Sequence, residues 1–210
     1  MTMQRPFRLW LSLFAAFAAF TVSGADAETL SGKALVDALR QGGYELVMRH
    51  ANSPNMPPDR ASADPENTGL ERQLDAMGRD TARAMGEALI KLKIPLSVGL
   101  SSPSYRARET ARLARIMYIS HGELDEGAAG MSANAEKTRA DYLRARANEL
   151  PPARDNKIII SHAPNIISAF GKDAEGIASG EVMVFRPGTG GPTLVARVKI
   201  EEWPKLAAGG

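Results

Sequence analysis

The segment Tyr44-Glu45-Leu46-Val47-Met48-Arg49-His50 is the most informative stretch of this chain for its fold. It joins a short apolar run to an arginine, which can bind an anion, and a histidine, which can act as a nucleophile. A run of this length after Gly42-Gly43 is typical of a buried strand. Arg49 and His50 then lie at the mouth of that strand. A neutral imidazole in this position can attack an anion that the neighbouring guanidinium holds.

Two later segments supply the rest of such a site. Ser101-Ser102-Pro103-Ser104-Tyr105-Arg106 follows a short apolar run and brings a second arginine to the start of a helix. Ile158-Ile159-Ile160-Ser161-His162 ends another apolar run with a second histidine. The chain contains only three histidines, and two of them terminate strand-like segments.

Apolar periodicity, caps and breakers predict the elements around these segments. Helices are expected to begin at the caps Ser31, Asp75 and Ser102, and to end near residues 41, 94 and 118. Two further helices are expected over 133–150 and 164–170. Strands are expected over 44–48, 96–100, 157–161, 181–186 and 193–200, with the last two forming a hairpin. Residues 51–67 and 122–132 are predicted to be loops.

The alternation of helices and short strands predicts an α/β fold: a mostly parallel sheet flanked by helices on both faces, with an antiparallel edge hairpin. Ligands of such sheets bind beyond the carboxyl ends of the strands. Arg49-His50, the turn at Ser101 and His162 all follow predicted strands. We therefore expect them to meet at one rim of the sheet.

Composition narrows the class of protein. The chain has 210 residues and shows no linker or repeat, so a single domain over 28–210 is expected. Its net charge is +2, without a basic run, which argues against nucleic-acid partners. It contains no cysteine, which excludes disulfides and thiolate chemistry. Two arginines beside two histidines would repel a dication, so no metal is expected.

The first 27 residues have the layout of a signal peptide. Arg5 and Arg8 precede an apolar stretch over 9–22, and Ala25-Asp26-Ala27 fits a small-residue cleavage site. The apolar stretch is short for a membrane span, which needs roughly 20 residues. We therefore expect a periplasmic or secreted protein without stable membrane insertion after cleavage. A retained anchor is the alternative.

The candidate residues suit chemistry on a phosphate group. Arginine forks such as those of Arg49 and Arg106 bind two oxygens of an anion and stay charged. A protonated His162 would add a further donor. Transfer of the phosphoryl group to His50 and then to water would also need a carboxylic acid for the leaving oxygen. The loop over 122–132 offers Glu123, Asp125 and Glu126.

Together these motifs resemble the histidine phosphatase superfamily, which includes the cofactor-dependent phosphoglycerate mutases. The matching segments occur in the order in which that family has them, with Ala51 and Ala163 in place of common glycines. The tail around Glu181 and Trp203 is similar to that of small exported members. The segments are Arg49-His50-Ala51, Leu74-Asp75-Ala76-Met77-Gly78, Ser101-Ser102-Pro103-Ser104-Tyr105-Arg106-Ala107-Arg108-Glu109-Thr110-Ala111 and Ser161-His162-Ala163.

The resemblance implies a role for each site residue. His50 would be the phosphorylated nucleophile, and Arg49, Arg106 and His162 would form the phosphate pocket. Leu124-Asp125-Glu126 resembles the Leu-Asn-Glu that carries the acid in the mutases, which makes Glu126 the first candidate for the proton donor. Asp125, Glu123 and Glu181 remain alternatives.

The implied activity is that of a metal-independent phosphatase without a cofactor. It would act on a phosphomonoester or a phosphohistidine through a phosphohistidine intermediate. Its substrate could be a phosphorylated small molecule, a lipopolysaccharide sugar phosphate or a phosphoprotein. The alternative is a non-catalytic phosphate-binding or regulatory envelope protein in which the acid position is degenerate.

Overall fold

The computed structural model describes residues 29–54, 68–126 and 130–209, so the predicted signal peptide over 1–27 lies outside the described residues. The helices are α1 (Gly32–Gln41), α2 (Ala76–Lys91), α3 (Tyr105–Leu113), α4 (Ala133–Arg146), α5 (Ala163–Phe170) and α6 (Glu202–Ala208). The strands are β1 (Glu45–Arg49), β2 (Gly99–Ser101), β3 (Tyr118–Ser120), β4 (Lys157–Ser161), β5 (Val182–Arg186) and β6 (Thr193–Val198). Short 3-10 turns form η1 (Thr68–Leu70), η2 (Gly122–Leu124) and η3 (Gly171–Ala174).

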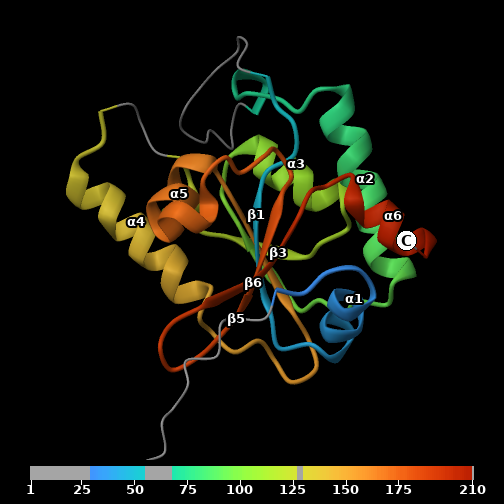
Figure 1. The fold of residues 1–210 in the computed structure, drawn as a ribbon. Coiled ribbons are helices and arrows are strands. Elements are labelled where there is room, and N and C mark those ends of the chain that lie inside the picture. Colours follow the sequence, from blue (N-terminus) through green and yellow to red (C-terminus); the bar gives the residue numbers. More distant parts are fainter. Residues whose placement is uncertain (1–28, 55–67, 127–129, 210) are drawn as a thin grey trace, which may run out of the picture.

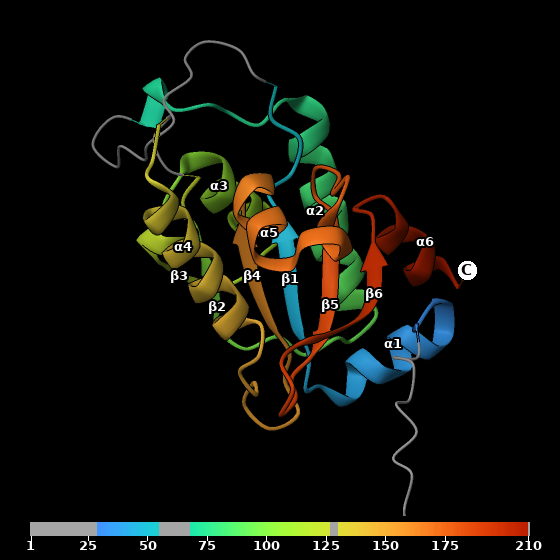
Figure 2. The same cartoon turned by 60° about the vertical axis from the view of Figure 1, so that its left-hand side comes forward.

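The described strands form one sheet in the order β3-β2-β4-β1-β5-β6 (Figure 2). β3, β2, β4 and β1 are parallel, whereas β5 runs antiparallel to both β1 and β6. The prediction of a mostly parallel sheet with an antiparallel edge hairpin is therefore confirmed. The hairpin closes the β1 side of the sheet, and β3 forms the opposite edge.

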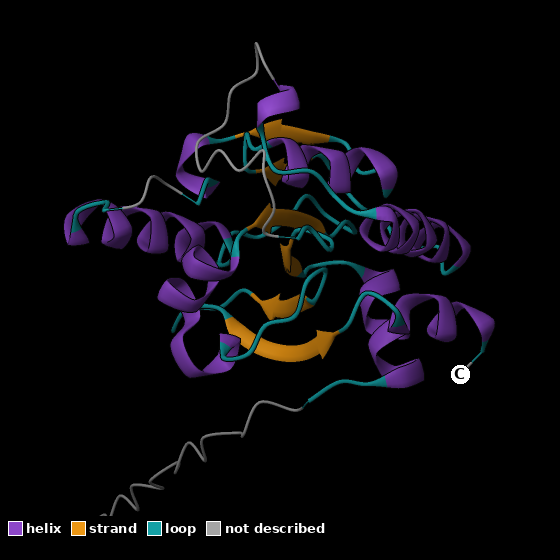
Figure 3. Ribbon diagram, turned by 90° about the horizontal axis from the view of Figure 1, so that it is seen from above, coloured by secondary structure: helices purple, strands orange, loops and turns teal. Residues whose placement is uncertain are grey.

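Both faces of the sheet are covered, and the alternation of side chains along each strand shows how. In β1, Leu46 and Met48 join one apolar core, while Val47 joins the other. In β4, Ile158 and Ile160 likewise belong to the first core and Ile159 to the second. The first core packs against α1, α2, α3 and α6, and the second against α4 and α5. Figures 1 and 3 show the two helix layers on either side of the strands.

The third helix and the strand after it differ from the prediction. α3 begins after the N-cap Ser104 rather than at Ser102, and it ends at Leu113 rather than near residue 118. Arg115 has a φ of 57°, a left-handed conformation that ends the helix. The chain then turns back, and Tyr118–Ser120 pairs with Gly99–Ser101 as the unpredicted strand β3.

Smaller differences lie at element ends and in the tail. α4 stops at Arg146, short of the predicted residue 150, and Leu96 contributes only an isolated bridge to Asn156 rather than the start of β2. The tail forms the unpredicted helix α6, and its Trp203 is completely buried in the first core. None of the helices in the described part of the chain combines the length and apolar composition needed to cross a membrane.

Glu45 is a carboxyl group buried at the start of β1, remote in the strand from His50. Its side chain is fully buried, and the ammonium group of Lys157 on the neighbouring strand lies 3.2 Å from Oε1. Burial raises the pKa of Glu45 to about 8 despite this partner. The group thus keeps a proton in the folded protein well above the pH at which it would ionise in the unfolded chain.

We expect Glu45→Gln to remove a pH-dependent loss of stability. Because the folded-state pKa of about 8 lies above the ordinary 4.5, the stabilisation is complete below pH 4.5 and is lost as the pH rises through 8. The variant should exceed the unchanged protein in free energy of unfolding at pH 8.5 by on the order of 1–3 kcal/mol, and much less at pH 5. Urea unfolding at both pH values measures this, and parallel pH curves would contradict it.

Candidate active site

The register of the central strands brings the two predicted histidines together. Arg49 pairs with Ser161 in the parallel β1–β4 ladder, so His50 and His162 each follow directly at the same rim. Their ring centroids lie 5.2 Å apart. The chain leaves β1 toward α2 on one face and leaves β4 into α5 on the other. This divergence between neighbouring parallel strands is where α/β sheets form their binding crevices.

His50 is held in one tautomer by its neighbour along the chain. Its side chain is buried, and its Nδ1 lies 2.8 Å from the carbonyl oxygen of Ala51. Because a carbonyl only accepts hydrogen bonds, Nδ1 carries the proton and Nε2 keeps its lone pair. The N–H of Ala51 donates to Thr110 Oγ1 on α3, which anchors this turn. Burial, assisted by nearby arginines, lowers the pKa of His50 to about 3.

His162 has the opposite arrangement. Arg106 Nη2 lies 3.1 Å from Nδ1, and since a guanidinium only donates, Nδ1 is the acceptor and Nε2 carries the proton. On the other side of the ring, Nε2 lies 2.8 Å from Ser102 Oγ and 3.3 Å from Ser104 Oγ. Burial, the neighbouring His50 and Arg106 hold the pKa of His162 well below 6.5. The ring is therefore neutral in the free site.

The two predicted arginines flank these rings. Arg106 comes from the first turn of α3, is 1% exposed, and binds the carboxylate of Glu126 through Nη2. Arg49 donates from Nη1 to the carbonyl of Ile177 at 2.9 Å. The Nε atoms of both arginines are buried and have no hydrogen-bond acceptor among the residues that the structure describes. Such donors suit the oxygens of a bound anion.

Arg72 is a third arginine at the site, and the sequence motifs did not single it out. Its Nη2 lies 3.5 Å from His50 Nε2, and its Nε donates to Ser53 Oγ at 3.1 Å. The segment before α2 is anchored there by the buried carboxylate of Glu71, which accepts from the backbone N–H of Tyr105. No spacing pattern in the sequence predicts this tertiary contact between Arg72 and His50.

The structure separates the four acidic candidates. Glu126 reaches the pocket, where its carboxylate binds Arg106 and lies 3.9 Å from His162 Nδ1. Asp125 is buried on the far side of His162, 3.7 Å from Nε2. Glu123 is exposed, and Glu181 forms an ion pair with Arg197 at 2.7 Å. Glu126 is thus the acidic candidate on the Arg106 side of His162, whereas Asp125 lies at a similar distance from the ring on its Nε2 side.

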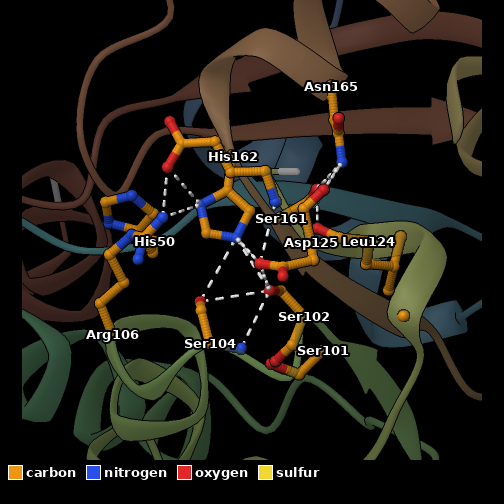
Figure 4. A network of polar contacts seen from close by, with 12 residues as sticks. His50, Ser101, Ser102, Ser104, Arg106, Leu124, Asp125, Ser161, His162 and Asn165 are labelled. Atoms are coloured by element: carbon orange, nitrogen blue, oxygen red, sulfur yellow. Dashed lines mark hydrogen bonds and ion pairs between the residues drawn. The ribbon is translucent and has the colours of Figure 1, made fainter. Parts of the chain in front are cut away.

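Ser102 and Ser104 join this network in a way that sequence analysis missed (Figure 4). Ser102 was expected to cap α3, but the N-cap is Ser104; besides the backbone N–H of Ser104, the Ser102 hydroxyl contacts His162 Nε2 and lies 3.3 Å from Asp125 Oδ1. The sequence does show Ser102 and Ser104 shortly after a predicted strand. Only the path of the chain in the structure shows that their hydroxyl groups point toward the His162 ring. Among the described residues, no group of three or more metal-ligating side chains comes together.

Comparison with known proteins identifies one family. The family model of the histidine phosphatase superfamily (branch 1) matches residues 46–165. A structure of the protein histidine phosphatase SixA complexed with tungstate is 20% identical, with a TM-score of 0.54, covering 76% of this chain and 98% of that one. A putative alpha-ribazole-5'-P phosphatase from Escherichia coli K-12 MG1655 is 17% identical, with a TM-score of 0.55, covering 73% and 95%.

A third solved structure has the same fold. Phosphoserine phosphatase from Entamoeba histolytica, in complex with 3-phosphoglyceric acid, is 14% identical with a TM-score of 0.53, and the match covers 73% of this chain and 95% of that one. At these identities the likeness concerns the fold alone. The comparison with curated proteins gives no match.

Proposed function

The chain belongs to the histidine phosphatase superfamily, branch 1, and on that premise we propose that it is a phosphatase that works through a phosphohistidine at His50. The observation that carries the proposal is the state of His50: a buried, neutral ring whose Nδ1 is bound to the Ala51 carbonyl at 2.8 Å. Its Nε2 carries no proton, so the lone pair of that nitrogen can attack a phosphorus atom. Arg72 Nη2 lies 3.5 Å from His50 Nε2, so this guanidinium would help to hold the phosphoryl group next to the nucleophile.

The proposed reaction has two steps. In the first, His50 Nε2 forms a bond to phosphorus while the bond to the leaving oxygen breaks, and Glu126 gives that oxygen a proton. In the second, Glu126 takes a proton from water as the water oxygen attacks the phosphohistidine, which releases phosphate and restores His50. Dividing a difficult displacement in this way is the usual advantage of covalent catalysis.

The arginines would supply the electrostatic part of catalysis. Charge spreads over the equatorial oxygens during phosphoryl transfer, and fixed guanidinium donors stabilise that charge without reorganising. Arg49 and Arg106 each bring a buried Nε that has no acceptor among the described residues. A dianionic phosphate that takes Arg106 would displace the carboxylate of Glu126, which then faces a negative neighbour. That change favours the protonated acid needed for the leaving group.

We propose phosphorylated small molecules, lipopolysaccharide sugar phosphates and phosphoproteins as the candidate substrates. The protein would act on them in the periplasm or outside the cell. The location rests on the signal-peptide pattern of residues 1–27. Hydrolysis of p-nitrophenyl phosphate by the purified protein in the presence of EDTA tests the activity. A protein that binds phosphate but turns over no phosphomonoester or phosphohistidine would instead be the non-catalytic anion-binding alternative.

We expect Glu126→Gln to impair substrates with poor leaving groups most. Expelling an alkoxide needs a proton, whereas p-nitrophenolate leaves with little help. The variant should lose about 10²-fold in kcat/KM, which reports the first step, for an alkyl phosphate and less than about tenfold for p-nitrophenyl phosphate. Equal losses for both substrates would move the acid to another residue.

We also expect His50 to stay neutral in the free protein across the working pH range. Because burial lowers its pKa to about 3, the ring should take up no proton between pH 7.5 and 4.5. Imidazole NMR titration of the protein without phosphate measures this. A midpoint near 6.5 for His50 would show that the pocket does not keep the nucleophile unprotonated.

A further inference from the structure

Asp125 lies behind His162, and the contacts between them form a directed chain. Nε2 of His162 carries a proton and donates to Ser102 Oγ at 2.8 Å. The backbone N–H of Ser104 also donates to that oxygen, at 3.2 Å. With both lone pairs of the hydroxyl occupied, its single proton is left for an acceptor. Asp125 Oδ1 lies 3.3 Å away, and a carboxylate is a stronger acceptor than the alternative, Ser104 Oγ at 3.1 Å.

Asp125 itself is held in place from several sides. Its Oδ1 accepts the backbone N–H of Glu126 at 2.9 Å, and its backbone carbonyl accepts from Asn165 and Arg139, each at 2.7 Å. Its side chain is 11% exposed. The carboxylate is thus a fixed charge at the Nε2 side of His162, on the opposite side of the ring from the guanidinium of Arg106.

The arrangement has a consequence once a phosphate group enters the pocket. In the free protein, Nδ1 of His162 accepts a hydrogen bond from Arg106. A dianion that takes the Arg106 donors leaves the Nδ1 lone pair facing a negatively charged oxygen, which is repulsive. Uptake of one proton from solvent at Nδ1 turns that atom into a donor and converts the contact to an attractive one. The resulting imidazolium then needs a counter-charge at Nε2.

We propose that Asp125, acting through Ser102, is a positioning residue that fixes the tautomer of His162 and supports proton uptake at Nδ1 when phosphate binds. The proposal rests on the proposed phosphatase function for its catalytic consequence. The charged and titratable groups around His162 are Arg106, Arg72, Arg49, His50, Glu126 and Asp125. Of these, Asp125 alone approaches the ring from the Nε2 side in the described contacts.

The test reads the protonation of His162 directly by long-range proton–nitrogen NMR of the full chain, with and without saturating inorganic phosphate. The chain has three histidines, so few imidazole signals need assignment. The free protein should show the Nε2–H tautomer, and the phosphate complex should show both nitrogens protonated. In Asp125→Asn with phosphate, His162 should remain singly protonated at the same pH. Asp80→Asn, an exposed side chain on α2, is the matched control.

Kinetics supply a second readout that a merely structural role would not move. In Asp125→Asn, kcat should fall about 10–100-fold and KM should change by less than about threefold. The pH optimum should move toward acid, because the imidazolium is then harder to form. Ser102→Ala should show the same shift to a smaller extent, and it serves if the Asn variant does not fold. A loss equal at every pH, or an unchanged phosphate-bound imidazolium in folded Asp125→Asn, would overturn the proposal.

The NMR arm separates the two proposals. The tautomer of His162 in the free protein and its proton uptake with phosphate need no turnover, so they are decided even if the chain hydrolyses nothing. Conversely, an active enzyme whose His162 carries its proton on Nδ1 in the free state would refute the role of Asp125 and leave the phosphatase function standing.

Discussion

His50→Ala should abolish turnover while leaving the protein folded. The substitution removes the Nε2 lone pair that would attack phosphorus, and no other described side chain offers a neutral, oriented nucleophile at that point. His162 lies close by, but its Nδ1 is engaged by Arg106 and its Nε2 by Ser102. We expect kcat for p-nitrophenyl phosphate to fall roughly 10⁴-fold or more, as when other catalytic nucleophiles are deleted.

The third histidine provides the control for this experiment. His121 lies outside the pocket, where its Nδ1 contacts the hydroxyl of Tyr142 at 2.8 Å. His121→Ala should keep its activity, and circular dichroism with thermal unfolding establishes that both variants fold. His50→Asn keeps more of the buried volume if the alanine variant proves unstable. Full turnover by a folded His50 variant would reject nucleophilic catalysis by this residue.

Arg106→Lys should be the second most damaging change. Lysine keeps the positive charge but cannot present the planar fork that bonds two phosphoryl oxygens. Its ammonium could still donate to His162 and Glu126, as Arg106 Nη2 does in the free site, but it lacks the second nitrogen of the fork. We expect kcat/KM to fall about 10²–10³-fold, the size typical for loss of a fixed donor to a developing charge.

The same helix supplies a matched control. Arg112 lies on α3 six residues further along, its side chain is 66% exposed, and it pairs with Glu109 at 2.7 Å. Arg112→Lys should therefore leave kcat/KM close to that of the unchanged protein. Steady-state kinetics on both variants compares the two positions. Equal values for Arg106→Lys and the unchanged protein would show that the fork of Arg106 does not bind the transferring group.

Local signals were sufficient for the central strands and for the rim of the sheet. β1 and β4 are short, mostly apolar runs that are buried on both faces. This pattern is typical of parallel strands, so they can be predicted before their neighbours in the sheet are known. Once β1 and β4 are parallel neighbours, the histidines that follow them must meet. The sequence therefore predicted a common rim for His50 and His162, and the pairing of β1 with β4 in the structure is what brings their rings together.

Features that depend on tertiary contact could not be predicted in that way. β3 is three residues long and exists because it pairs with β2, while its own sequence continues a helical pattern. Arg72 reaches His50 because Glu71 anchors its segment to the start of α3. The choice of Asp125 for the far side of His162 and Glu126 for the pocket depends on the turn after η2, which composition does not encode.

The central claim is that the phosphoryl group passes through a covalent bond to His50. Mixing the protein with p-nitrophenyl phosphate, quenching at alkaline pH to preserve phosphohistidine, and sequencing the digested peptides by mass spectrometry tests it most directly. We predict one phosphoryl group on the peptide that contains His50, at the imidazole, and none in His50→Ala. Hydrolysis that proceeds with phosphate on a different residue, or with no phosphorylated protein at any time after mixing, would contradict the account.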